Sequence, residues 1–338
     1  MPTISELEAK LSEPSQALVR DMAELEGDIL ILGVGGKIGP SLAKMAKNAI
    51  GLAGADKKVI GVSRFSEGTL QKELEENGIS TIPADLLDDK QLRELPDVKN
   101  VIYMAGQKFG TTGKEYFSWA MNTYLPGRVA EKYHNSRIVV FSTGNVYPLT
   151  PVKMGGVSEE FPAAPVGEYA QSVLGRERIF EYFSHKHQTP VVQFRLNYAI
   201  DLRYGVLYEL AKAVKEGRPI DLRMGHANVI WQGDVNEYAL RSLLVCSAPP
   251  RILNVTGPET ASIRWLAERF GELFGVNPVF VNEERDTALL SNSSLAHSLF
   301  GYPRVTLREM IKWTVEWIAA GGKTIDKPTH FQEREGKF

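Results

Sequence analysis

Short apolar runs alternate with longer amphipathic segments through the first 200 residues of the chain. The apolar runs predict strands, and they lie within residues 28–36, 57–63, 80–85, 100–106, 137–143 and 190–197. The segments between them repeat apolar residues with the period of a helix, and they cover 41–54, 69–78, 86–95, 119–134 and 168–185. Because strands that alternate with helices form parallel sheets covered on both faces, this pattern predicts a doubly wound α/β fold.

Beyond residue 200 the alternation loosens. Amphipathic helices are predicted over 205–217, 262–275 and 306–322, and a strand that returns to the sheet over 251–256. We expect three parts: an N-terminal helical extension over 1–27, a large α/β domain over 28–200 with the returning strand near 250–256, and a smaller substrate-binding region over 201–338. The polar end of the chain, 323–338, fits either a disordered tail or a strap across the site.

The composition narrows the kind of partner. The 338 residues carry a formal net charge of −2, which gives no basic surface for nucleic acid or for an anionic membrane. A single cysteine, Cys246, excludes an intramolecular disulfide and fits a reducing compartment. No apolar run reaches the roughly 18 to 20 residues of a membrane span, and the N-terminus lacks the features of a signal peptide. We therefore expect a cytoplasmic protein with a small-molecule substrate and with no nucleic-acid or membrane partner.

A glycine-rich turn, GVGGKIG, joins the first predicted strand to the first predicted helix of the α/β pattern. Gly33, Gly36 and Gly39 lie three residues apart, so the backbone can approach a pyrophosphate while the helix N-terminus supplies amide donors and a positive dipole. A tight turn without a ligand would need similar residues. The position at the first strand–helix junction favours a dinucleotide site, to which Lys37 and Ile38 also belong.

Several segments in order along the chain resemble the extended short-chain dehydrogenases/reductases of the NAD-dependent epimerase/dehydratase type. These segments are GVGGKIG, ADLLD, YMAGQKFG, FSTGNVY, EYAQS, ILNVTGPETASIRWLAE and LFGYPRVTLREMI. The likeness covers about residues 28–320. It implies a Rossmann domain that binds a nicotinamide dinucleotide, with hydride transfer at a carbinol carbon of a sugar or sugar acid. Epimerase, dehydratase and simple dehydrogenase chemistry all remain open. The family commonly forms homodimers, which we also expect here.

The resemblance also assigns cofactor contacts. Asp85 and Leu86 match the segment that contacts the adenine, and Ala105, Gly106 and Lys108 match the strand end beside the cofactor.

Three further residues match the family's catalytic positions. Thr143 falls where a hydroxyl binds the reacting oxygen, Tyr169 falls on the catalytic tyrosine, and Asn122 falls on the helix asparagine. Each also has a purely structural interpretation, as a strand-end cap, a helix-start aromatic or a surface amide. Their common order along the chain favours the catalytic one.

The choice of cofactor depends on the end of the second predicted strand. A carboxylate there would bind the ribose hydroxyls of NAD. This chain instead has Ser63 and Arg64, whose hydroxyl and guanidinium suit a 2′-phosphate. We therefore favour NADP over NAD, while a surface position for Arg64 stays open.

The sequence departs from the family one helical turn after the tyrosine, where Val173 replaces the usual lysine. A free tyrosine has a pKa of about 10, so a phenolate at neutral pH without help costs on the order of 4 kcal/mol. Lys108 and Arg176 can each supply a positive charge, and Lys108 follows a strand end directly, so we expect Lys108 to be the substitute. A non-catalytic dinucleotide-binding sensor or scaffold is the alternative function.

The substrate side is predicted from polar and aromatic residues near strand ends. Where relatives often carry an arginine that binds a diphosphate, this chain has Ala227. An indole can stack on a sugar ring, and amides, imidazoles and guanidinium groups can bind its polar groups. The expected substrate contacts are Thr143, Asn145, Asn197, Arg203, Tyr204, His226, Trp231, Gln232 and Arg285. No cluster with metal-ligand spacing is found, so we expect no metal.

Overall fold

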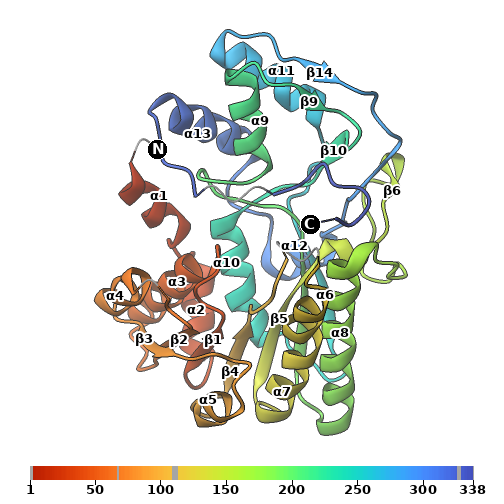
Figure 1. Ribbon diagram of the computed structural model, residues 1–338. Coiled ribbons are helices and arrows are strands. Elements are labelled where there is room, and N and C mark those ends of the chain that lie inside the picture. Colours follow the sequence, from red (N-terminus) through yellow and green to blue (C-terminus); the bar gives the residue numbers. More distant parts are fainter. Residues whose placement is uncertain (1–2, 67, 109–112, 326–328, 338) are drawn as a thin grey trace.

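Seven parallel strands form the central sheet of the computed structural model, which describes all residues except 1–2, 67, 109–112, 326–328 and 338 (Figure 1). In spatial order they are β3 (Ser80–Pro83), β2 (Val59–Ser63), β1 (Ile29–Leu32), β4 (Asn100–Tyr103), β5 (Arg137–Thr143), β7 (Val191–Leu196) and β12 (Arg251–Val255). The strand order reverses between β1 and β4, and ligands of such sheets bind at this reversal, outside the carboxyl ends of the strands. The predicted doubly wound α/β fold is confirmed.

Helices cover both faces of the sheet because the central strands are apolar on both sides. Ile29 and Ile31 point into one core, and Leu30 and Leu32 point into the other, since successive side chains of a strand alternate between faces. The first core is shared with α2 (Gln16–Glu24), α3 (Gly39–Leu52) and α10 (Gln232–Arg241). The second is shared with α5 (Asp89–Glu94), α7 (Leu125–Lys132) and α8 (Gly167–His187).

The other elements fill the edges of the sheet and build the smaller region. In that region α9 (Val206–Lys215), α11 (Ile263–Phe274) and α13 (Leu307–Ala319) pack around a separate apolar core. The remaining helices are α4 (Thr69–Glu76), α6 (Glu115–Trp119), the π-helical turn η1 (Ala120–Tyr124) and α12 (Ser294–Phe300), with short 3₁₀ turns η2 (Gly144–Val146), η3 (Val152–Met154) and η4 (Ser242–Leu244). The short strands are β6 (Thr150–Pro151), β8 (Ala199–Ile200), β9 (Ile220–Asp221), β10 (His226–Ala227), β11 (Ile230–Trp231), β13 (Ala261–Ser262), β14 (Phe280–Val281) and β15 (Thr287–Ala288). None of the helices that the structure describes combines the length and the apolar character needed to cross a membrane.

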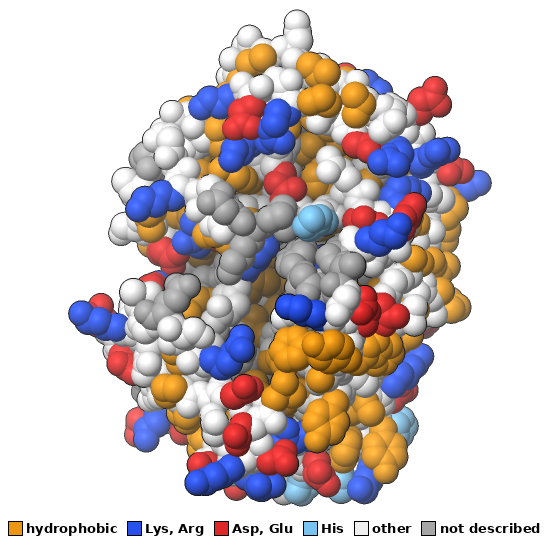
Figure 2. Space-filling model, in the orientation of Figure 1, with side chains coloured by type: hydrophobic (Ala, Val, Ile, Leu, Met, Phe, Trp, Pro, Cys, Tyr) orange, Lys and Arg blue, Asp and Glu red, His pale blue; other side chains and the backbone are white. Residues whose placement is uncertain are grey.

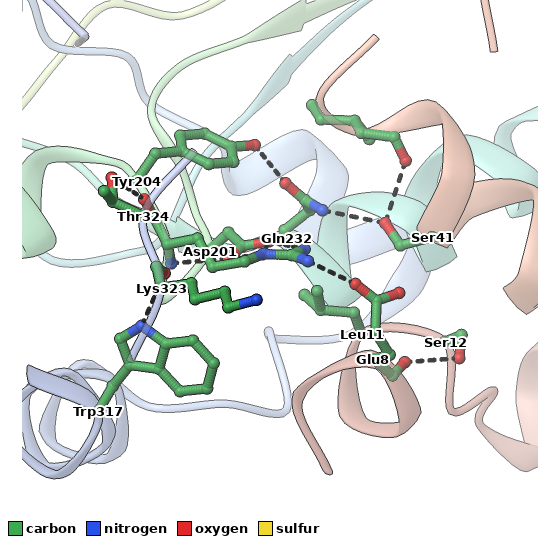
Figure 3. Close-up of polar contacts among 12 residues, drawn as sticks. Glu8, Leu11, Ser12, Ser41, Asp201, Tyr204, Gln232, Trp317, Lys323 and Thr324 are labelled. Carbon is green, nitrogen blue, oxygen red and sulfur yellow. Dashed lines mark hydrogen bonds and ion pairs between the residues drawn. The ribbon is translucent and has the colours of Figure 1, made fainter. Parts of the chain in front are cut away.

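The N-terminal helices connect the sheet to the smaller region. Leu7 and Leu11 of α1 (Ile4–Leu11) are buried in the core of the smaller region, whereas α2 packs on the sheet. Glu8, between those two leucines, pairs with Lys44 of α3 at 3.0 Å and with Arg203 at 2.6 Å (Figure 3). The helix α1 therefore bridges α3, which starts at the glycine turn, and the loop that precedes α9.

The end of the chain packs across the molecule. Phe331 is buried in the core of the smaller region, and the hydroxyl of Thr329 donates to Glu209 of α9 at 3.0 Å. Gly336 lies against Val166 and Gly167, because a Cβ on Gly167 would come 2.3 Å from the Gly336 carbonyl oxygen. The described residues 329–337 thus run from α9 to the start of α8.

Candidate active site

A groove of about 460 Å³ follows the carboxyl ends of β1, β2 and β4, at the reversal of strand order. The structure brings most of the predicted cofactor residues into its lining: Gly33, Gly36, Ser63, Arg64, Asp85, Leu86, Ala105 and Gly106. Gln107, Phe117 and Met121, which the sequence did not single out, line it as well. Lys37, Ile38 and Gly39 form the passage from the turn into α3.

The glycine turn fits the pyrophosphate of a dinucleotide. Gly33 has a φ of +92°, and a Cβ there would come 2.7 Å from the amide nitrogen of Ala105. A Cβ on Gly39 would come 2.2 Å from the carbonyl oxygen of Val34, so this glycine allows the helix to approach the strand. Gly36 instead faces open space, since its nearest neighbour would be 3.6 Å away. The first residue of the helix has no side-chain cap from Ile38, which leaves the amide donors and the positive dipole for a ligand.

The second strand ends in Ser63 and Arg64, beside the turn. Ser63 is half-buried and lies close to the turn, because a Cβ on Gly35 would come 2.5 Å from its hydroxyl oxygen. Arg64 is exposed at the edge of the groove. On the other side, a carboxylate oxygen of Asp85 accepts from the Leu87 amide at 3.0 Å, which orders the loop after β3.

Thr143 and Tyr169 come together at the end of β5. Thr143 is the last residue of β5, Tyr169 lies in the first turn of α8, and their side chains share a hydrogen bond. Burial raises the pKa of Tyr169, while the charge of Arg176 and the hydrogen bond to Thr143 lower it, and the net direction is upward. The pair therefore has the geometry to share a substrate oxygen, but the phenol is not acidic by itself.

Asn122 lies within the π-helical turn η1 and is fully buried. Its side-chain oxygen accepts from the Gln107 amide at 2.9 Å, and its nitrogen donates to the Gln107 carbonyl at 2.8 Å. The same nitrogen donates to the Ser172 hydroxyl at 3.0 Å. Asn122 thus holds the groove wall after β4 against α8. Extra residues in a helical turn of this kind are frequent at functional sites.

Val173 and Lys108 lie on different sides of Tyr169. Val173 is buried in an apolar cluster with Val146 and Tyr147. The Lys108 ammonium lies 5.4 Å from the centre of the Tyr169 ring, over its face. The pKa of Lys108 is lowered to about 8, first by burial and then by the nearby charge of Lys37, while Glu209 acts in the opposite direction.

Asn197 and Asn145 lie near the tyrosine. Asn197 is buried at the end of β7, and its side-chain nitrogen donates to the Leu289 carbonyl at 3.4 Å. Asn145 borders a small cavity of about 30 Å³ together with Leu289 and Arg334 of the C-terminal segment. Arg334 donates to the Thr287 carbonyl at 2.8 Å, so it is held on β15. Nothing in the polar sequence of 323–338 indicated that this arginine would lie here.

A second group of predicted substrate residues is engaged elsewhere (Figure 3). Arg203 pairs with Asp201 at 2.6 Å, in addition to Glu8. The Tyr204 hydroxyl donates to Gln232, whose nitrogen donates to the Ser41 hydroxyl at 2.9 Å. These contacts join α1, α3 and α10, and they leave these side chains outside the groove and away from Tyr169.

The last three predicted substrate residues are also spread apart. Trp231 is buried edge-to-face against Trp313, with ring centres 5.3 Å apart. His226 is half-buried in β10, and Arg285 is exposed in the loop before β15. The structure does not gather these three around the tyrosine. In the described part of the chain, no group of three or more His, Cys, Asp or Glu residues is placed to hold a metal ion.

Comparisons with known proteins agree with this geometry. The NAD dependent epimerase/dehydratase family matches residues 29–220. A search of curated proteins found no match. Among solved structures, MoeE5 in complex with UDP-glucose and NAD is 20% identical with a TM-score of 0.69, over 87% of this chain and 99% of that chain.

Two epimerases show the same likeness. The UDP-glucose 4-epimerase of Thermotoga maritima with UDP-glucose is 18% identical with a TM-score of 0.70, over 87% of this chain and 99% of its own. The UDP-glucuronic acid 4-epimerase of Bacillus cereus in complex with UDP-glucuronic acid and NAD is 20% identical with a TM-score of 0.69, over 86% and 99%. At these identities the structures show a shared fold.

Proposed function

The chain belongs to the NAD dependent epimerase/dehydratase family, and from this premise we propose that it transfers hydride at a carbinol carbon of a sugar or sugar-acid substrate. The observation that carries the proposal is the hydrogen bond between Thr143 and Tyr169 at the carboxyl end of β5. Gln107 lines the groove, and the next residue, Lys108, lies over the Tyr169 ring, so the pair is next to the cofactor groove. Solved neighbours that hold UDP-glucose or UDP-glucuronic acid support this substrate class.

In the oxidising direction, the proton of the carbinol hydroxyl passes to the Tyr169 oxygen while Thr143 binds the same substrate oxygen. A bound oxidised nicotinamide accepts the hydride that leaves the carbon. The positive charge of Lys108, over the ring face, favours the anionic form of Tyr169 when the amine is protonated. Whether the product is an epimer, a dehydrated sugar or a simple ketone depends on how the substrate moves after oxidation.

For the cofactor, the residues of the groove fit a nicotinamide dinucleotide, and the solved neighbours hold NAD. We propose a preference for NADP on the support of Arg64 and Ser63, which border the groove without a carboxylate at the end of β2. Arg64→Ala should weaken NADP more than NAD by about 1 to 3 kcal/mol, the cost of losing a charge-assisted hydrogen bond. Equal losses in calorimetric titrations would place Arg64 outside the phosphate site.

We also propose that the protein is a homodimer. Large aromatic side chains are exposed on α6, η1 and α8, namely Tyr116, Trp119, Tyr124 and Tyr182. Hydrophobic side chains gather over these helices below the central hollow in Figure 2. Such exposed apolar groups favour association of two chains. A cytoplasmic location is proposed on the support of the single cysteine.

The test of the catalytic proposal is turnover with a panel of sugars, sugar acids and nucleotide sugars, followed at the absorbance of the reduced nicotinamide. Tyr169→Phe should bind the cofactor as tightly as the wild type and lose most of the activity. Tyr182→Phe is a matched control, since this exposed tyrosine lies at the far end of the same helix. If Tyr169→Phe retains turnover, the acid/base assignment fails.

A non-catalytic binder is the second candidate, and one observation favours it. Val173 is packed in an apolar cluster directly behind Tyr169, where the family places a lysine. Tight dinucleotide binding without turnover on any member of the panel would support this second function.

A further inference from the structure

Arg176 lies in the middle of α8, seven residues after Tyr169, and only 5% of its surface is exposed. Helical side chains point back toward the N-terminus of their helix, so a long side chain at 176 reaches the turn that contains Val173. Its guanidinium nitrogens donate to the Phe141 carbonyl at 2.7 Å and to the side-chain oxygen of Asn122 at 2.8 Å. The arginine therefore ends between β5 and η1, not at the surface.

The guanidinium lies directly behind the wall of the cofactor groove. A Cβ on Gly106 would come 2.5 Å from a terminal nitrogen of Arg176 and 3.0 Å from the oxygen of Asn122. Gly106 is part of the groove lining. The helix itself comes close to η1 at Gly175, where a Cβ would come 2.7 Å from the Thr123 hydroxyl. Two glycines thus make room for a buried cation beside the site.

The charge of Arg176 has no carboxylate partner in the part of the chain that the structure describes. All three of its hydrogen bonds go to neutral oxygens, two of them on Asn122 and one on Phe141. Arg195, which is equally buried, instead binds both carboxylate oxygens of Glu177, at 2.9 and 2.6 Å. A buried guanidinium without a counter-ion is costly, and the cost falls when an anion forms nearby.

Tyr169 is the group near Arg176 that can become such an anion. The charge of Arg176 opposes the upward effect of burial on the pKa of Tyr169. Lys108 is the other cation that faces the tyrosine, from the loop after β4, and it has Lys37 and Glu209 near it.

We propose that Arg176 stabilises the phenolate of Tyr169 from behind the groove wall and, through Asn122, holds Gln107 in the wall. Arg176 is thus a positioning residue that supplies the positive charge absent at Val173. The proposal rests on the proposed acid/base role of Tyr169. It differs from the role of Lys108, because Arg176 keeps its charge at every pH of interest.

The test compares three variants of the full chain. Arg176→Gln removes the charge, and Arg176→Lys keeps it. Arg178→Gln is the matched control, since Arg178 lies on the same helix, is exposed and pairs only with Glu181, at 2.8 Å, among the described residues. Tyrosine ionisation is followed by ultraviolet absorbance against pH, and the difference from the same protein with Tyr169→Phe isolates the signal of Tyr169.

Arg176→Gln should move the midpoint of the Tyr169 titration upward by about one pH unit or more, the effect of losing a nearby opposite charge. The pH profile of turnover should move with it, giving about a tenfold lower rate at neutral pH. Arg176→Lys should retain most of the wild-type behaviour, and Arg178→Gln all of it. An unchanged midpoint in folded Arg176→Gln, or an equal shift in Arg176→Lys, would overturn the proposal.

Gly106→Ala gives a second test if Arg176→Gln does not fold. The new methyl group would displace the guanidinium without removing its charge from the protein, so the Tyr169 midpoint should again rise, and a wild-type midpoint would count against the proposal. The absorbance titration does not depend on turnover. Failure of the catalytic proposal, seen as an active Tyr169→Phe, is therefore distinguished from failure of the coupling between Arg176 and Tyr169.

Discussion

The three glycines of the turn differ in what a methyl group would meet at each. At Gly33 and Gly39 it would meet the protein's own backbone, at 2.7 and 2.2 Å, so these two residues serve the close approach of strand and helix. At Gly36 the nearest atom would be 3.6 Å away, and the residue borders the groove. Gly36 is therefore the position where a side chain tests ligand binding without disturbing the fold.

Gly36→Val should abolish dinucleotide binding while the protein stays folded, because the side chain would fill the space that the pyrophosphate needs. The expected loss of affinity for both NAD and NADP in calorimetry is at least about tenfold, or 1.4 kcal/mol. Gly51→Val is the control, since Gly51 lies in the last turn of the same helix and a Cβ there meets nothing within 4 Å. Undiminished binding by Gly36→Val would remove the turn from the cofactor site.

Lys108 makes stability depend on pH in a specific window. The folded chain releases this proton near pH 8, whereas the ordinary lysine value is 10.5. Between these values the unfolded chain binds more protons, so stability should rise with pH through this window. The free energy of unfolding of the wild type should therefore increase relative to Lys108→Met between pH 8 and 10.5. Denaturant titrations at several pH values measure it, and a constant difference would contradict the buried position of the amine.

At the scale of helices, α1 is held by one carboxylate with two cations. Glu8 pairs with Lys44 of α3 and with Arg203 before α9, and its side chain is 24% exposed. Burial raises the pKa of Glu8, but the two cations lower it by more, so the net pKa is lowered. The helix that starts at the glycine turn and the loop before α9 are thus connected through α1 (Figure 3).

Glu8→Gln should destabilise the protein by about 1 to 3 kcal/mol, because Lys44 and Arg203 would lose their shared counter-charge in a partly buried place. Glu13→Gln is the control, since Glu13 is 56% exposed and pairs with exposed Lys10, and its loss should cost less than about 1 kcal/mol. Urea unfolding followed by circular dichroism compares the two. Equal costs would show that α1 is held by its leucines alone.

At the scale of the whole molecule, the C-terminal segment connects the smaller region to the start of the tyrosine helix. Phe331 is its apolar anchor in the core of the smaller region, and Gly336 lies at the other end, against Gly167. Between them, Glu333 and Arg334 border the small cavity next to Asn145. The segment therefore covers a part of the molecule that a substrate next to Tyr169 would approach.

Phe331→Ala should release this segment before the rest of the protein unfolds, because a chain end without its buried anchor opens locally. Limited proteolysis within 329–337 should become faster by about tenfold or more, while Gln332→Ala, at an exposed neighbouring position, should behave as the wild type. Cleavage at the wild-type rate in Phe331→Ala would mean that the polar contacts of Thr329 and Arg334 hold the segment by themselves.

The pattern of the chain was sufficient for the fold and for the family. Continuous apolar runs such as ILIL at Ile29–Leu32 are buried on both faces, and this composition has few alternatives to a central parallel strand. The glycine turn was also readable, since each glycine answers a local demand of the backbone. The family match over residues 29–220 confirms the resemblance seen in the motifs.

The fate of individual polar side chains was decided only by tertiary structure. Arg203, Tyr204 and Gln232 have the chemistry of substrate contacts, but Glu8 and Ser41, far away in sequence, take their hydrogen bonds. Spacing on a helix predicts which face a residue occupies, yet it does not tell which partner from another strand or helix waits there. For the same reason, Arg176 is recognisable as a buried cation behind Gly106 only once β4, η1 and α8 are packed together.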